Sequence, residues 1–225
     1  MTKARINSIC LHIRSKLALL GVMVLLGSST FAFDELNEAQ SLIYDNSHLS
    51  NTTEGQELKY AYTAVNSEQG DIVDSASVSI VAAGSDDKRD ISIDFLSGER
   101  HLPLPDFSGY RGNPVIIAML EHIAQSMSAE TGGGALYFRN RIRDALAGDD
   151  VSLIEQSFSY SGDEYESVTL TFYPFVNDPY LAENTLLKQA RFSIQLSETI
   201  PGGVVGVEAS SRTDEEIFER SLSLM

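Results

Sequence analysis

The sequence predicts an α+β fold, a curved antiparallel sheet of about seven strands wrapped around a central pair of helices inserted after the third strand. One long stretch, 113–147, has the 3.6-residue period of amphipathic helices. The segments on either side alternate apolar and polar residues with the period of two that is typical of β-strands. A sheet with one apolar face must cover something, and these helices are the only amphipathic segments of adequate size.

The first helix is expected to start at Asn113-Pro114, because asparagine caps helix ends and proline suits the first helical position. Gly132-Gly133-Gly134 should end it, since glycine reaches the left-handed conformations that helix ends need. Its apolar face consists of Ile116, Met119, Leu120, Ile123 and Met127.

A second, shorter helix is expected at about 135–147. Its apolar stripe consists of Phe138, Ile142, Ala145 and Leu146.

Seven strands are expected around these helices, with short polar turns that suit antiparallel hairpins. The region 98–112 contains Pro103, Pro105, Gly109 and Gly112 and is expected to be irregular. The predicted strands are 57–65, 72–82 and 88–96 before the helices, and 151–160, 164–175, 186–196 and 204–210 after them.

Residues 1–32 have the pattern of a secretory signal peptide, a basic leader followed by the apolar run 17–26 and small residues before Ala32. The apolar run is short for a membrane span, which needs about 20 residues. An uncleaved N-terminal anchor is the alternative. We therefore predict three parts: a signal peptide at 1–32, a single domain at 33–212 and an acidic tail at 213–225. The protein is expected in the periplasm, or secreted, and not as an integral membrane protein after cleavage.

The charge of the chain excludes some partners. All charges in the leader are basic, so the mature chain carries 12 Lys and Arg against 32 Asp and Glu, a net charge of −20. Such a chain repels nucleic acid and anionic membrane surfaces over most of its area. The one cysteine, Cys10, lies in the leader, which excludes disulfides from the mature part.

A basic cluster is unusual in so acidic a chain: Arg111, Arg139, Arg141 and Arg143 are a third of the mature basic residues. Arginine matches carboxylate and phosphate oxygens bidentately, so the cluster could bind an anionic ligand or an acidic partner. The alternative, which we favour, is that these arginines pair with carboxylates of the surrounding acidic sheet.

No catalytic or metal-binding motif is found, and we expect neither a cofactor nor a metal. The mature histidines are His48, His101 and His122, and none has a zinc-motif neighbour. An enzyme is therefore less expected than a binding protein. A histidine-based hydrolase of envelope glycan or lipid would need one of these rings beside a serine or carboxylate in a cleft.

The order of strands, helical pair and further strands resembles the half-barrel carriers of bacterial lipoprotein sorting, the LolA/LolB kind. The stretches Gly112-Asn113-Pro114-Val115-Ile116 and Tyr137-Phe138-Arg139-Asn140-Arg141-Ile142-Arg143 also look like a feature that recurs in exported bacterial proteins. This chain departs from those carriers in lacking tryptophan and in its central helical pair. The resemblance implies an apolar cavity between sheet and helices that binds acyl chains.

The leading expectation is a non-enzymatic periplasmic binding or chaperone-like protein for a lipid, a lipoprotein or another amphiphilic anionic ligand. Its alternatives are the hydrolase and a structural or assembly accessory that docks an acidic partner; the oligomeric state stays open. The residues expected to bind the ligand are Met119, Ile123, Met127 and Phe138 for its apolar part and Arg111, Arg139, Arg141 and Arg143 for its anionic group.

Overall fold

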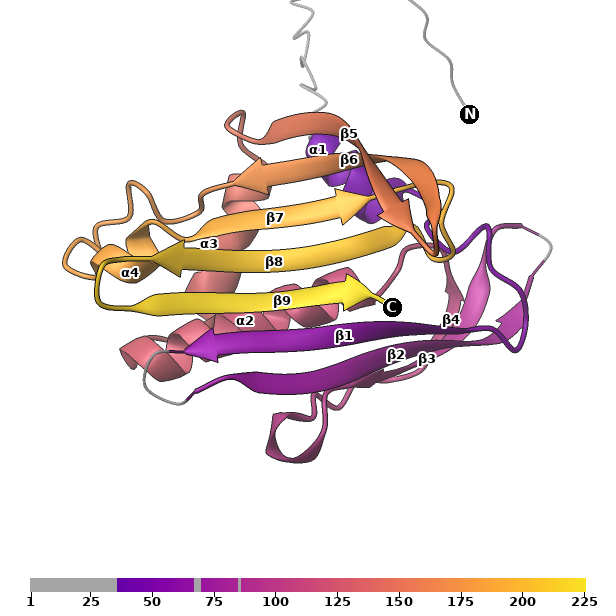
Figure 1. The fold of residues 1–225 in the computed structure, drawn as a ribbon, viewed down its shortest axis with the longest axis horizontal. Helices are drawn as coiled ribbons and strands as arrows, with labels where there is room; N and C mark the ends of the chain where they lie inside the picture. Colours follow the sequence, from indigo (N-terminus) through magenta and orange to yellow (C-terminus); the bar gives the residue numbers. More distant parts are fainter. Residues whose placement is uncertain (1–35, 67–69, 85) are drawn as a thin grey trace, which may run out of the picture. The chain divides into compact units, whose positions relative to one another are not determined.

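A computed structural model describes residues 36–66, 70–84 and 86–225, so the predicted signal peptide lies outside the described residues. These residues form an α+β fold with one large open antiparallel sheet, as predicted (Figure 1). The sheet has nine strands, not seven, in the order β4-β3-β2-β1-β9-β8-β7-β6-β5. The strands are β1 Glu57–Asn66, β2 Ile72–Ala83, β3 Arg89–Phe95, β4 Phe107–Tyr110, β5 Ser152–Tyr160, β6 Asp163–Phe172, β7 Arg191–Leu196, β8 Val204–Arg212 and β9 Ile217–Leu224.

Two antiparallel meanders make up this sheet. The first runs from β1 to β4 and the second from β5 to β9, and β9 pairs with β1 to join them. The connection from β4 to β5 therefore leads from one edge of the sheet to the other. It contains the two central helices, α2 Val115–Thr131 and α3 Ala135–Leu146. The other helical segments are α1 Glu38–Gln40, a π-helical turn at Ser41–Asp45, a 3₁₀ turn at Gly98–Arg100 and α4 Thr185–Lys188.

The two additional strands are β4 and β9. Most of the stretch predicted as an acidic tail, 213–225, is strand β9, which lies in the middle of the sheet. The alternation of β9 is hidden by Arg220, a charged residue on the inward face between Phe218 and Leu222. Its guanidinium lies 4.9 Å from the centre of the Phe218 ring and bonds to Glu130 of α2 at 2.8 Å, so the charge is buried with partners.

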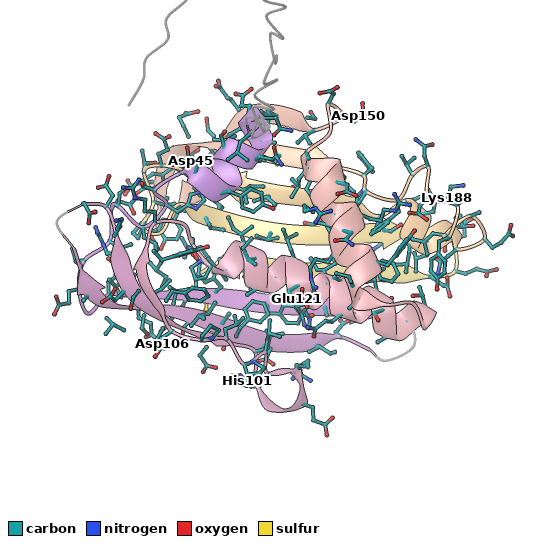
Figure 2. The ribbon with its side chains drawn as sticks, turned by 180° about the vertical axis from the view of Figure 1, so that it is seen from behind. Asp45, His101, Asp106, Glu121, Asp150 and Lys188 are labelled. Atoms are coloured by element: carbon teal, nitrogen blue, oxygen red, sulfur yellow. The ribbon has the colours of Figure 1, made fainter. Side chains whose placement is uncertain are left out.

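The central helices cover one face of the sheet, as Figure 2 shows from behind. The predicted apolar faces of both helices are buried there, except for the partly buried Ala145, together with the inward residues of the strands. Burial of apolar surface is the main force that holds such layers together. The largest side chains of this core are Tyr60, Tyr62, Phe95, Phe138, Phe172, Phe175, Phe192 and Phe218.

The start of α2 is tied to the sheet through Asn113. Its Oδ1 accepts a hydrogen bond at 3.1 Å from the backbone N–H of Val115, the first residue of α2. Its Nδ2 donates to the Tyr60 hydroxyl of β1 and to the Gly202 carbonyl of the β7–β8 loop, both at 2.8 Å. Asn113 is therefore a junction of helix, strand and loop.

The segment 37–50 is attached at both ends to the helical pair. At one end, Asn37 Nδ2 donates to the Leu146 carbonyl at 3.0 Å, at the end of α3. At the other end, Leu49 N donates to the Arg111 carbonyl at 3.2 Å, ahead of α2. This segment therefore runs beside the sheet and forms one wall of the site described next.

Candidate functional site

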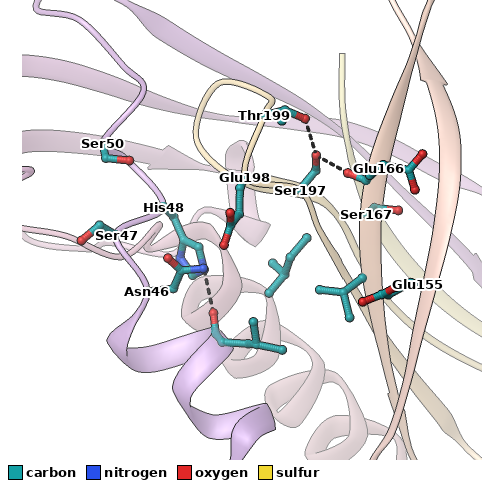
Figure 3. Close-up of a pocket in the computed structure, with 14 residues that line it drawn as sticks. Asn46, Ser47, His48, Ser50, Glu155, Glu166, Ser167, Ser197, Glu198 and Thr199 are labelled. Atoms are coloured by element: carbon teal, nitrogen blue, oxygen red, sulfur yellow. Dashed lines mark hydrogen bonds between the residues drawn. The ribbon is translucent and has the colours of Figure 1, made fainter.

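A pocket of about 640 Å³ lies between the segment 42–50, the β5–β6 hairpin and the β7–β8 loop (Figure 3). The register of the sheet places its floor: Glu155 of β5 pairs with Val168 of β6, and Val168 pairs with Leu196 of β7. These three residues form one row on the inward face, beyond the part that the helices cover. The wall opposite this row is formed by Leu42, Asn46, Ser47, His48 and Ser50.

The lining combines apolar side chains with carboxylates and hydroxyls. Leu42, Val168 and Leu196 are its apolar residues, and Leu196 is buried. Three exposed glutamates lie around them, and the lining includes no Lys or Arg. The glutamates are Glu155, Glu166 and Glu198, and the hydroxyls are those of Ser47, Ser50, Ser167, Ser197 and Thr199.

Several of these hydroxyls already have protein partners. Ser197 Oγ donates to the Glu166 carbonyl at 2.6 Å and lies 3.0 Å from the Thr199 hydroxyl. Ser157, beside the pocket, donates to the Glu166 carboxylate at 3.1 Å. These bonds hold the β5–β7 side of the pocket in place and leave carboxylate oxygens for a ligand.

His48 is a buried part of the wall, 5% exposed. Its Nε2 lies 2.8 Å from the Leu42 carbonyl, and its Nδ1 accepts from Asn113 N at 3.2 Å. Burial lowers the pKa of His48, so the ring is neutral at physiological pH. With both nitrogens bonded to backbone groups, this ring is not placed as a general base.

The other two histidines lie apart from this pocket. His122 Nε2 is 2.8 Å from the Tyr62 hydroxyl, and burial, the largest cause, lowers the pKa of His122 to about 4. His101 is exposed, with Nδ1 3.2 Å from the Leu96 carbonyl and 3.5 Å from the Asp94 carboxylate. Neither lines any of the three pockets described for this structure.

The structure places three of the four arginines in ion pairs. Arg139 forms a bidentate pair with Glu121 of α2, and this hydrogen bond lowers the pKa of the carboxyl. Arg143 pairs with its neighbour Asp144 at 2.8 Å. Arg111 lies exposed in the turn ahead of α2. Three of the arginines therefore pair with carboxylates, but their partners lie on the two helices and in the loop after β6, not on the sheet as expected.

Arg141 differs from the others because its partner is buried. Its Nε lies 2.8 Å from Oδ2 of Asp178, whose side chain is 1% exposed. The buried Tyr137 hydroxyl belongs to the same group, and the Tyr137 ring stacks 5.1 Å from Tyr180. This group attaches the loop after β6 to α3.

We expect Arg141→Ala to lower the free energy of unfolding by about 2–3 kcal/mol, because it leaves the buried Asp178 carboxylate without a cation. Arg143→Ala is the matched control, and its exposed pair with Asp144 contributes under about 1 kcal/mol. Urea unfolding of both variants measures the difference, and equal losses would contradict the role given to Asp178.

The apolar residues predicted to bind the ligand lie in the closed core. Met119, Ile123, Met127 and Phe138 are all 0% exposed, and none lines the three pockets. The structure does not bring them together with the arginines around one opening.

Sequence reasoning missed the pocket residues, although β5 carried a usable pattern. After Leu153, its inward positions are Glu155, Ser157 and Ser159, so this face becomes polar before the strand ends. That change indicates a part of the sheet that no helix covers.

Comparison with models of known protein families gives no match, and comparison with curated proteins gives none either. Within the described ranges, no group of three or more His, Cys, Asp or Glu is arranged to hold a metal ion. No helix in the described part of the chain has both the length and the apolar character needed to cross a membrane.

Proposed function

We propose that this chain is a non-enzymatic binding protein of the bacterial envelope. It takes an amphiphilic molecule into the pocket between the segment 42–50 and strands β5 to β7. The apolar part of the ligand lies on Leu42, Val168 and Leu196, and a cationic group, such as an amine or quaternary ammonium, faces the glutamates. The envelope location rests on the signal-peptide pattern of the sequence.

One observation carries the proposal: three glutamates and three apolar side chains line one pocket, and that lining has no Lys or Arg. A pocket of about 640 Å³ is within the range of small-molecule sites, roughly 300–1,000 Å³. A cation placed among carboxylates gains Coulomb energy there, whereas an anion is repelled.

The ligand proposed here carries a cationic group, whereas the sequence led us to expect an anionic one. That expectation placed an anionic group at Arg139 and Arg143. Those arginines are engaged with Glu121 and Asp144, and neither belongs to the pocket. We still propose that the protein binds an amphiphile, but at a different site and with a cationic headgroup in place of an anionic one.

Calorimetric titration with three surfactants of equal chain length tests the proposal: dodecyltrimethylammonium, dodecyl maltoside and dodecyl sulfate, each below its micelle concentration. We expect the ammonium to bind and the sulfate to bind at least about tenfold more weakly, a difference of about 1.4 kcal/mol. The variant Glu155→Gln/Glu166→Gln/Glu198→Gln should lose this preference.

A matched control separates the pocket from the general acidity of the chain. Glu183→Gln/Glu215→Gln/Glu216→Gln removes the same charge from a second acidic hollow, beside the β8–β9 turn. It should leave ammonium binding unchanged. Equal loss in both triple variants, or preference for sulfate, would refute the proposal.

A further inference from the structure

The backbone partners of His48 define which tautomer the ring has. The Leu42 carbonyl can only accept a hydrogen bond, so Nε2, 2.8 Å away, must carry the proton. The Asn113 N–H can only donate, so Nδ1, 3.2 Å away, must be an unprotonated acceptor. A second proton on the ring would set an N–H of His48 directly against the N–H of Asn113.

This ring is also where the wall of the pocket is attached to α2. His48 lines the pocket, while Asn113 is bonded to β1 and to the β7–β8 loop. The loop also packs closely on this residue: a methyl group added at Gly203 would lie 3.0 Å from His48 Cβ and 3.2 Å from Cδ2 of its ring.

We propose that His48 is a proton-sensitive latch: protonation of Nδ1 breaks the hydrogen bond to Asn113 and loosens the pocket wall formed by Leu42–Ser50. If the pocket binds the amphiphile proposed above, on which this consequence rests, ligand is released as the pH falls. Glu198, which lines the same pocket, offers a carboxylate to the displaced, charged ring (Figure 3).

The direction of the pH effect follows from burial. Burial lowers the pKa of His48 below its ordinary value of 6.5, against a smaller raising effect of the Leu42 hydrogen bond. The closed wall is therefore fully stabilised above pH 6.5 and is lost as the pH falls through the lowered pKa. The charged and titratable groups on the elements around the ring are Tyr44, Asp45, Tyr60, Arg111, Glu155, Glu166 and Glu198.

The latch itself is tested on the full mature chain without ligand, by nitrogen NMR of the His48 ring and hydrogen exchange at the Asn113 amide. We expect the Nε2–H tautomer near neutral pH, and protection of the Asn113 amide that falls by up to about tenfold for each pH unit from about 6.5 down to the lowered pKa of the ring. His48→Gln supplies a donor and an acceptor that do not titrate and should remove this pH dependence. His101→Gln, on the exposed surface, should retain it.

Titration of dodecyltrimethylammonium into the wild-type chain and His48→Gln then tests release. We expect the wild-type affinity to fall more steeply below about pH 6.5 than that of the variant, in which only the glutamates titrate. Protection of the Asn113 amide that is unchanged while the ring takes up its proton would overturn the latch. Absence of binding at every pH would refute the proposed function alone, because the amide measurement needs no ligand.

Discussion

Phe138→Ala is expected to lower the free energy of unfolding by about 3–5 kcal/mol. Phe138 lies on α3, and its ring is fully buried in the core between the helices and the sheet. It makes edge-to-face contacts with Tyr137 at 5.3 Å and Phe175 at 5.7 Å between ring centres. Alanine removes both contacts and leaves a cavity in a closely packed core. Urea unfolding followed by circular dichroism measures the loss.

The matched control lies two residues earlier on the same helix. Leu136 is 61% exposed, so Leu136→Ala should change the free energy of unfolding by no more than about 0.5 kcal/mol. If both variants lose the same small amount, α3 does not pack on the sheet as described, and the arrangement of helices over an apolar face is incorrect.

Asn113→Ala is expected to lower the free energy of unfolding by about 2–4 kcal/mol. Asn113 is 2% exposed and its side chain bonds to Tyr60, Gly202 and Val115. Alanine leaves three buried polar groups without this partner, and water cannot readily replace it. Urea unfolding measures the loss, which should also appear as faster hydrogen exchange at the start of α2.

A double-mutant cycle with Tyr60→Phe isolates one of these bonds. Tyr60→Phe removes the hydroxyl that Asn113 binds. In this background Asn113→Ala should therefore lower the free energy of unfolding by about 1 kcal/mol less than it does in the wild-type chain. Strict additivity of the two substitutions would show that the Asn113–Tyr60 bond contributes nothing to stability.

Local sequence pattern predicted most of the fold because the helices and most strands have clear apolar periods. The helix faces built on Met119 and Phe138 are buried as predicted, and Gly132 ends α2 with a φ of 70°, which suits glycine. The strands that were missed lack such a period: β4 has only four residues, and Arg220 interrupts β9.

The site was less predictable because tertiary pairing decides it. The partners of Arg139 and Arg141 are Glu121 and Asp178, which lie 18 and 37 positions away and become neighbours only in the fold. The pocket likewise joins three segments far apart in the chain, such as those holding His48, Glu155 and Glu198. No pattern within one segment identifies such a site.

Mapping of dodecyltrimethylammonium binding by backbone NMR tests the central claim most directly, since it locates the ligand without assuming the pocket. The account predicts shift changes concentrated at 42–50, Val168 and 196–199, with few along α3. Changes centred instead on Arg139 and Arg143, or spread evenly over the acidic surface, would contradict it.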